Sequence, residues 1–287
     1  MKSFLDIEQE LNAVNSVHSL TSVFEGISSM RISQIKNQVV SSQQFFEELW
    51  SMYVQIRVGK YFHYGRQESG QKVSEKELFI AITAEGGFSG GIDEKLITEM
   101  LKDYDPEKHD IIVVGHHGAI QLVQHHVSFL KYFKMPSRDT NINVLPIIRE
   151  VQKYRATSVF YQSYQSLMVQ SIKKIELDRA IEERGKTAKT NQQVISEATF
   201  IFEPSTYAVV DHLERSMMTI ALSQTILESK LAQYASRFQA MSNARNKSEE
   251  LLGGLRLTYN RTKREITDER LREIIGGRKL IGRKASS

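Results

Sequence analysis

Residues 206–275 read TYAVVDHLERSMMTIALSQTILESKLAQYASRFQAMSNARNKSEELLGGLRLTYNRTKREITDERLREII, seventy residues without a proline. As one helix, this segment would be roughly 105 Å long at 1.5 Å per residue. The preceding Pro204 with Ser205 predicts its start, and Gly276-Gly277 predicts its end. A helix this long cannot bury its own apolar side chains, so it must contact another segment or another protein.

Apolar residues recur along this segment at alternating steps of three and four, from Val210 to Tyr259. This spacing places them on one face of a helix and predicts one strand of a coiled coil. The members of this seam from its middle onward are Leu227, Leu231, Tyr234, Phe238, Met241, Leu252, Leu255 and Tyr259.

The opposite end of the chain supplies a partner helix. Residues 1–58 contain no proline and one glycine, Gly26. Apolar residues at three-four spacing run from Ile32 to Ile56, and a similar stripe that starts at Phe4 loses register around His18 and Thr21. This break indicates a stutter or a change of partner. We expect the two terminal helices to pair antiparallel.

Between the helices, residues 74–203 have the pattern of a small α/β domain. Short apolar runs that end at glycine-containing turns are typical of buried parallel strands. Strands are expected at 78–83, 111–114, 141–148 and 198–202, with 158–176 ambiguous, and helices at 92–101 and 119–133. The predicted organisation is therefore a first long helix (1–58), a Rossmann-like domain that does not bind nucleotide (74–203), a second long helix (205–277) and a basic tail (278–287).

The turn Glu85-Gly86-Gly87-Phe88-Ser89-Gly90-Gly91 follows the first strand, where phosphate-binding loops are found. Its spacing matches neither G-x-G-x-x-G nor a glycine-rich loop that ends in Lys-Ser or Lys-Thr. A structural tight turn is the favoured interpretation, so we expect no nucleotide cofactor.

The sequence carries no recognisable catalytic or metal site. His116-His117 and His125-His126 are adjacent pairs, and neighbouring residues point in different directions on a helix or a strand, so neither pair chelates a metal by local geometry. There is no cysteine. No paired carboxylates, nucleophile elbow or Ser/His/Asp set can be identified either. The chain is predicted to be non-catalytic, without cofactor or metal.

The formal net charge is +4, and basic residues crowd the C-terminal segment after Arg256. Three explanations remain: a solvated helix face, a contact with an acidic partner, or nucleic acid. The third is disfavoured because no aromatic interleaving or nucleic-acid motif accompanies the charge. No run approaches eighteen apolar residues and the start is acidic, so neither a membrane span nor a secretory signal is expected.

Several motifs resemble one known family. Ala240-Met241 leads through Leu255 and Tyr259-Asn260-Arg261 to Ile266-Thr267, and Phe202-Glu203-Pro204-Ser205 precedes this helix. With the turn at 85–91, these motifs resemble the gamma subunit, the central stalk, of the rotary ATP synthases and ATPases. Between Lys263-Arg264 and Ile266-Thr267 the chain is one residue shorter than the family pattern, which indicates a divergent or alternative-type member.

The resemblance implies a rotor shaft that couples transmembrane ion flow, such as hydrogen ion transport, to ATP synthesis or hydrolysis. Its implied partners are the alpha and beta subunits of the catalytic ring, the epsilon subunit and the membrane rotor ring, at the cytoplasmic face of a bacterial membrane. The implied subunit contacts are Arg31, Lys263, Arg264, Thr267 and Arg270.

One alternative stays open: a dimerising coiled-coil scaffold protein with an inserted α/β domain. It would use the seam from Val210 to Tyr259 for self-association.

Overall fold

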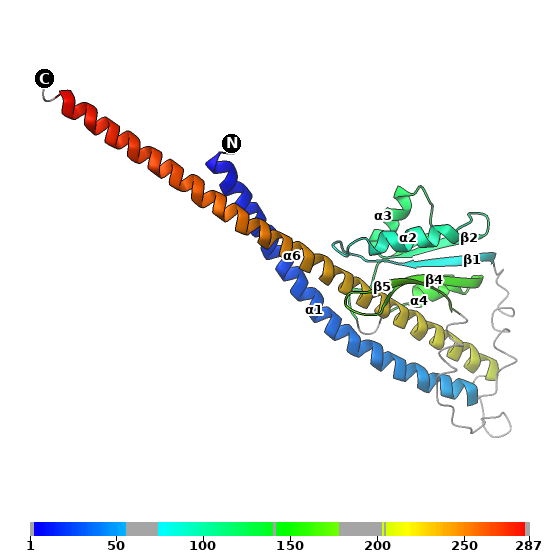
Figure 1. The fold of residues 1–287 in the computed structure, drawn as a ribbon. Helices are drawn as coiled ribbons and strands as arrows, with labels where there is room; N and C mark the ends of the chain where they lie inside the picture. The colour runs from blue at the N-terminus through cyan, green and yellow to red at the C-terminus, as the bar shows by residue number, and fades with distance from the viewer. Residues whose placement is uncertain (1–2, 56–73, 140–141, 178–202, 204, 285–287) are drawn as a thin grey trace. The chain divides into compact units, whose positions relative to one another are not determined.

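The computed structural model describes residues 3–55, 74–139, 142–177, 203 and 205–284 (Figure 1). The chain divides into two compact units. The terminal unit consists of Met1–Gly26 and Ala240–Ser287, and the sheet unit of Ile27–Gln239.

The N-terminal helix α1 spans Phe4–Gln55. A reciprocal pair of hydrogen bonds caps its start: the Ser3 amide donates to Asp6 Oδ2 at 3.0 Å, and the Asp6 amide donates to Ser3 Oγ at 3.2 Å. Such a capping box satisfies two amide groups that lack helical partners. The predicted first helix is thus present.

The C-terminal helix α6 spans Thr206–Lys284. The Ala208 amide donates to Ser205 Oγ at 3.2 Å, which caps the start near the predicted residue. The predicted end at Gly276-Gly277 is wrong, because the helix runs through both glycines into the segment expected to be a basic tail. Glycine costs about 1 kcal/mol in a helix relative to alanine, but it ends one only where the backbone turns left-handed, and no proline follows.

The sheet unit contains a five-stranded sheet in the order β3-β2-β1-β4-β5. The strands β1 to β4 are parallel to one another, and β5 pairs antiparallel with β4. The strands are β1 Ser74–Ile82, β2 His109–Val114, β3 Lys131–Phe133, β4 Tyr154–Tyr164 and β5 Gln170–Glu176. The helices between them are α2 Ile92–Asp103, α3 His116–Gln124 and α4 Leu145–Val151. This order places the topological switch point between β1 and β4.

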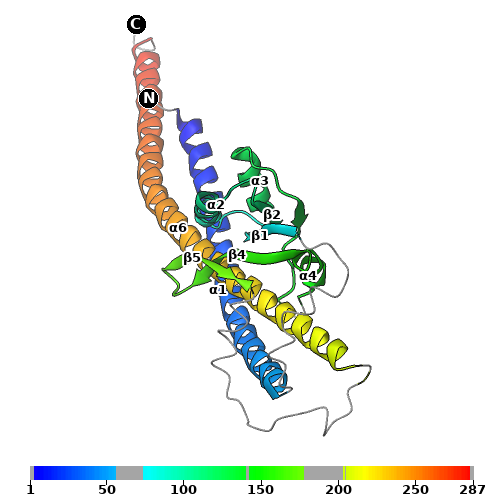
Figure 2. The same ribbon diagram turned by 90° about the vertical axis from the view of Figure 1, so that its right-hand side faces the viewer.

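Successive side chains of a strand point to opposite faces of the sheet, so the buried strands form a core on each face. Phe79, Ala81 and Phe160 pack with α2 and α3 on one face. Leu78 and Ile80 pack on the other face with α4 and with the first part of α6, from Met217 to Ile226. Figure 1 shows α2 and α3 on the opposite side of the sheet from α4 and α6, and the rotated view in Figure 2 agrees.

Three sequence expectations for this domain need correction or lie outside the structure. Residues 145–151 form α4 rather than a strand, since Pro146 fits the first turn of a helix but lacks the amide that a strand ladder needs. The helix expected at 119–133 ends at Gln124, because His126 has a φ of 57°, and Lys131–Phe133 form an edge strand. The ambiguous segment 158–176 contains most of β4 and all of β5, and the strand expected at 198–202 lies outside the described residues.

The two long helices pack antiparallel within each unit. In the sheet unit, Ile35 of α1 is fully buried against Leu227 and Leu231 of α6, with Tyr234 beside them. In the terminal unit, the Phe4 ring packs in a tilted arrangement against Tyr259, with ring centroids 4.9 Å apart. The stripe of α1 does not lose register: Val14, His18, Thr21 and Glu25 continue the three-four spacing, and all four are buried or half-buried. The predicted stutter or change of partner rests on the polar side chains of His18 and Thr21, which nevertheless lie on the inward face.

Candidate functional site

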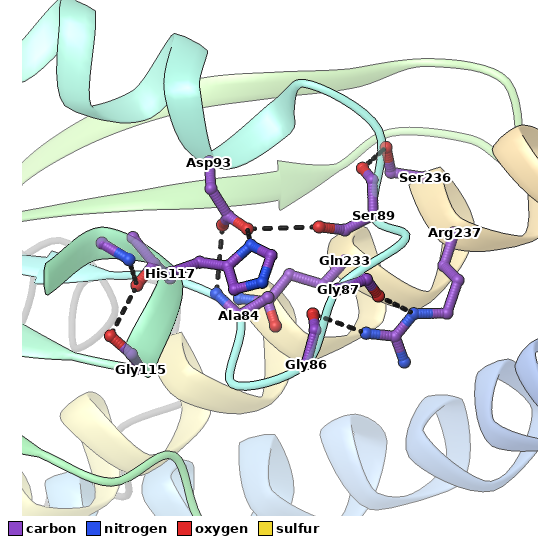
Figure 3. A network of polar contacts seen from close by, with 12 residues as sticks. Ala84, Gly86, Gly87, Ser89, Asp93, Gly115, His117, Gln233, Ser236 and Arg237 are labelled. Atoms are coloured by element: carbon purple, nitrogen blue, oxygen red, sulfur yellow. Dashed lines mark hydrogen bonds and ion pairs between the residues drawn. The ribbon is translucent and has the colours of Figure 1, made fainter. Parts of the chain in front are cut away.

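The buried carboxylate of Asp93 lies at the switch point of the sheet, in the first turn of α2 (Figure 3). Its Oδ1 accepts hydrogen bonds from the Ala84 amide at 3.0 Å and from Gln162 Nε2 at 2.8 Å. Its Oδ2 accepts one from Ser89 Oγ at 3.2 Å and lies 3.5 Å from His117 Nδ1. Burial raises the pKa of Asp93, although the hydrogen bonds and His117 act in the opposite direction.

The glycine-rich turn is fastened to α6 by two adjacent side chains. Arg237 donates from Nε to the Gly87 carbonyl at 3.1 Å and from Nη2 to the Gly86 carbonyl at 3.0 Å. Ser236 Oγ donates to the Ser89 carbonyl at 2.6 Å. Figure 3 shows both side chains reaching from α6 to the turn. The turn itself has left-handed backbone at Phe88 and Gly90, with φ of 68° and 64°.

Gln162 of β4 connects this turn to a second place on α6. Its Nε2 donates to Asp93, and its Oε1 accepts from Ser229 Oγ and from Gln233 Nε2, the latter at 3.1 Å. All four residues are buried. The sheet, the turn and α6 are therefore joined by one continuous set of hydrogen bonds.

This arrangement has the opposite polarity to a phosphate-binding loop. Such loops point backbone N–H groups at the ligand, whereas here three carbonyl oxygens of the turn point at donors of α6. The ends of β1 and β2 are also closed, since a Cβ at Gly115 would lie 2.0 Å from the Thr83 carbonyl oxygen. The position that would hold a dinucleotide in this topology is taken by the chain's own helix.

A second buried polar cluster joins both long helices to the loop before α4. The Lys230 ammonium pairs with Asp139 and donates to the Pro136 carbonyl at 2.9 Å. Arg31 Nη1 lies 3.4 Å from the other oxygen of the same carboxylate. Arg31, expected from the resemblance to contact another subunit, therefore has a partner within its own chain.

The other predicted contact residues lie on the exposed surface of α6 in the terminal unit. Lys263, Arg264, Thr267 and Arg270 are all exposed. Lys263, Thr267 and Arg270 follow three-four spacing and share one helix face. Nothing in the structure tests their role, which stays a prediction.

The predicted seam residues of α6 occupy protected positions. Leu227, Leu231, Met241 and Leu252 are buried, and Tyr234, Phe238, Leu255 and Tyr259 are half-buried. Upstream of them, Met217 of the same stripe packs on the sheet, with Leu213 and Ile220 beside it.

The side chains of His116 and His117 contact different neighbours. His117 contacts Asp93, while the His116 ring meets Tyr132 edge-on at 6.3 Å. Within the described residues, no three His, Cys, Asp or Glu side chains are grouped so that they could hold a metal ion. None of the helices described in the structure is long and apolar enough to cross a membrane.

Sequence reasoning missed the residues that fasten the sheet to α6. The sequence predicts a structural tight turn at residues 85–91 but indicates no role for Asp93, Gln162, Ser229, Gln233 or Arg237. One signal was available, since Lys230 and Gln233 are polar residues beside the apolar seam of a helix. Such residues are retained in cores when partners satisfy them.

Comparison with known proteins agrees with this architecture. A family model described as ATP synthase matches residues 3–279. Curated relatives named ATP synthase gamma chain include those of Cytophaga hutchinsonii, 21% identical with 98% of this chain and 99% of the relative covered, and of Acetivibrio thermocellus, 24% identical with 96% and 98% covered.

Solved structures share the fold at low sequence identity. A chain of the Euglena gracilis mitochondrial ATP synthase, in an assembly described as OSCP/F1/c-ring, superposes with a TM-score of 0.65 at 15% identity, covering 97% of this chain and 94% of that chain. A chain of the Tetrahymena thermophila mitochondrial ATP synthase central stalk and c-ring gives 0.59 at 15% identity, with 78% and 99% covered. Because the family model spans nearly the whole sequence, this chain belongs to the ATP synthase family, alongside the curated gamma chains.

Proposed function

We propose that this chain is the central-stalk rotor shaft of a rotary ATP synthase or ATPase. The observation that carries the proposal is the match of the ATP synthase family model to residues 3–279, together with the antiparallel pair of long helices around an inserted α/β domain. In this function the chain performs no chemistry. An asymmetric shaft favours a different state of each catalytic site as it turns, through differences in contact free energy.

The filled switch point supports a mechanical role for the α/β domain. Hydrogen bonds from Ser229, Gln233 and Arg237 hold the sheet on α6, so that a force applied to the domain would reach the helix. The titles of the similar solved structures name F1, the c-ring and the central stalk. By analogy we assign this chain the alpha and beta subunits, the epsilon subunit and the membrane rotor ring as partners.

The predicted contacts with the catalytic ring are Lys263, Arg264, Thr267 and Arg270, with Arg31 on α1. Exposed cations on a helix tip suit carboxylates on the inner surface of a ring. The predicted location of this chain is the cytoplasmic face of a bacterial cell membrane. The chain would be held there only through the complex. The gamma-chain relatives named above come from bacteria.

Co-expression with the alpha, beta, epsilon and rotor-ring genes of the same organism tests the proposal. The chain has no cysteine, so a single Thr267→Cys variant carries a unique thiol. It should copurify with the ring and form a crosslink to an alpha or beta subunit. A chain that forms a stable dimer and leaves the ring subunits unbound would support the coiled-coil scaffold instead.

A further inference from the structure

A half-exposed histidine lies against the buried carboxylate of Asp93. His117 Nδ1 is 3.5 Å from Asp93 Oδ2, and the two side chains are 34% and 4% exposed. Figure 3 shows the ring directed at the carboxylate. The other edge of the ring lies beside the glycine-rich turn, because a Cβ added at Gly87 would be 3.8 Å from both Cε1 and Nε2 of His117. The exposed part of the side chain is therefore its Nε2 edge.

The other partners of Asp93 determine what the contact with His117 has to be. Asp93 Oδ1 accepts hydrogen bonds from the Ala84 amide and from Gln162 Nε2, and both of these groups can only donate. Asp93 Oδ2 accepts one from Ser89 Oγ. The residue also lies in the first turn of α2, where the helix dipole favours a negative charge. A carboxylate suits these surroundings, and its Oδ2 offers an acceptor to His117.

This acceptor selects the tautomer of His117. A neutral histidine carries one ring proton, and the hydrogen bond that one nitrogen makes decides where the proton sits. With Asp93 Oδ2 beside Nδ1, the proton belongs on Nδ1. The Nε2 atom is then left as the site at which His117 takes up a second proton from solvent.

A second proton on His117 supplies a positive charge next to the buried carboxylate. Burial raises the pKa of Asp93, which means that its negative charge is costly, and the charge of His117 acts in the opposite direction. His117 lies in the first turn of α3, where the helix dipole opposes a positive charge. A charged His117 is therefore held by Asp93 and not by its own helix.

The other charged groups on the surrounding elements have different partners or are exposed. Glu85 of the turn accepts a hydrogen bond from Tyr132, and Arg237 of α6 donates to carbonyl groups of the turn. On β4, the partner of Asp93 is the uncharged Gln162. The neighbouring titratable side chains of α2 and α3 are exposed, namely Glu94, Lys95 and His116.

The backbone around Ala84 joins the two members of the pair. The Ala84 amide donates to Asp93 Oδ1 at 3.0 Å, and the Ala84 carbonyl accepts from the His117 amide at 3.0 Å. A change in the attraction between His117 and Asp93 should therefore be felt at Ala84, at the end of β1.

We propose that His117 and Asp93 form a proton-sensitive link at the switch point of the sheet. Uptake of a proton by His117 turns their contact into an ion pair and strengthens the hold of α3 and the end of β1 on the buried carboxylate. The link lies within the sheet unit and does not depend on the proposed function.

The tautomer of His117 tests the link in the unmodified full-length chain. With nitrogen-15 histidine, ring NMR at pH 8 should find the proton of His117 on Nδ1, and the His117→Gln variant identifies its signals. In Asp93→Asn, a donating amide group takes the place of Oδ2, so the proton should move to Nε2. A proton on Nε2 in the unmodified chain would overturn the proposal.

Hydrogen exchange of the Ala84 amide measures the strength of the link. Its protection factor, which removes the intrinsic effect of pH on exchange, should fall about tenfold from pH 5.5 to pH 7.5, the change that one pKa unit represents. Glutamine can donate a hydrogen bond but takes up no proton, so most of this fall should be lost in His117→Gln. His116→Gln removes the adjacent exposed histidine and is the matched control, which should keep the fall.

An equal fall in His117→Gln and in the unmodified chain would assign the pH dependence to Asp93 alone and overturn the proposal. Circular dichroism checks that each variant is folded. If Asp93→Asn loses helix content, the tautomer in the unmodified chain and the exchange data for His117→Gln decide the question, since His117 is half-exposed and its replacement leaves Asp93 in place.

Discussion

The Lys230 ammonium is buried against the carboxylate of Asp139, which Arg31 also contacts at 3.4 Å. The side chains of Lys230 and Asp139 are 4% and 9% exposed. The cluster therefore joins α1, α6 and the loop before α4 through one carboxylate. Two buried charges are costly to separate from each other, but the pair need not stabilise the fold more than apolar residues would.

Removing one member of this pair should destabilise the sheet unit strongly. Lys230→Met leaves Asp139 with only the half-exposed Arg31 as a partner, and we expect a loss of about 3 kcal/mol in the free energy of unfolding. The double variant Lys230→Met/Asp139→Leu should recover much of that loss. Urea denaturation followed by circular dichroism measures both. If the double variant is no more stable than the single one, the unpaired charge of Asp139 is not the cause of the loss.

Replacing Asp93 should change how stability depends on pH. Burial raises the pKa of Asp93 above its ordinary value of 3.8, so the native state binds more protons than the unfolded state between that value and the raised one. This contribution to the free energy of unfolding is fully present below pH 3.8 and is lost as pH rises through the raised pKa. In Asp93→Asn the decline should disappear. Urea titrations of both proteins from pH 4 to pH 7 measure this difference in pH dependence. If the free energies of unfolding of the two proteins change with pH in parallel, Asp93 does not have a raised pKa.

The contacts of Arg237 with the glycine-rich turn should contribute more to the free energy of unfolding than an ordinary surface ion pair does. Arg237→Leu removes two charge-assisted hydrogen bonds to backbone carbonyls, and we expect a cost of about 2 kcal/mol. Arg215→Leu is the matched control, because Arg215 pairs only one turn away with Asp211 and should cost about 0.5 kcal/mol or less. Hydrogen exchange of residues 86–91 should accelerate in Arg237→Leu and not in the control. Equal effects would mean that the turn is held by other contacts.

Glycine substitutions should have opposite effects in the two units. A Cβ at Gly253 or Gly254 meets nothing within 4 Å, so alanine at either position should stabilise α6 by about 1 kcal/mol. Gly115→Ala should destabilise the sheet unit, because φ is 99° and the added Cβ would collide with the Thr83 carbonyl. Thermal melts of the three variants compare them directly. A Gly253→Ala protein that melts lower would contradict the expectation that this position has room for a side chain.

Much of the fold could be predicted from the sequence because its strongest signals are periodic. Absence of proline and three-four spacing predicted both long helices, and the short apolar runs predicted β1 and β2. The ends of helices were less predictable: Gly276-Gly277 has the composition of a stop, but a stop needs a left-handed backbone and not only glycine. The polar residues on the inward face of α1 predict a break in register that the structure does not show, since Thr21 is buried although it is not apolar.

The contacts that fasten the sheet to α6 could not be predicted, because they depend on tertiary structure. Gln162 and Ser229 are far apart in sequence, and neither type of residue indicates a partner by itself. Only the strand order brings the end of β4 beside the turn after β1, where Asp93 and α6 can both be reached. Local patterns in the sequence do not indicate where a long helix will pack on the sheet.

Neutralising the exposed cations near the end of α6 should weaken coupling in the assembled complex in a salt-dependent way. We expect the triple variant Lys263→Gln/Arg264→Gln/Arg270→Gln to lower ATP-driven ion pumping more at low ionic strength than at high, because salt already screens exposed charges. At 0.15 M ionic strength the screening length is about 8 Å, so the difference between the proteins should narrow there. Arg215→Gln serves as the control for loss of charge on the same helix in the sheet unit.

Pumping and ATP hydrolysis are measured together in reconstituted vesicles, so that loss of coupling is distinguished from loss of assembly. If both activities match those of the unmodified complex at every salt concentration, these cations do not contact the ring, and Thr267 and Arg31 remain as the predicted contacts to examine.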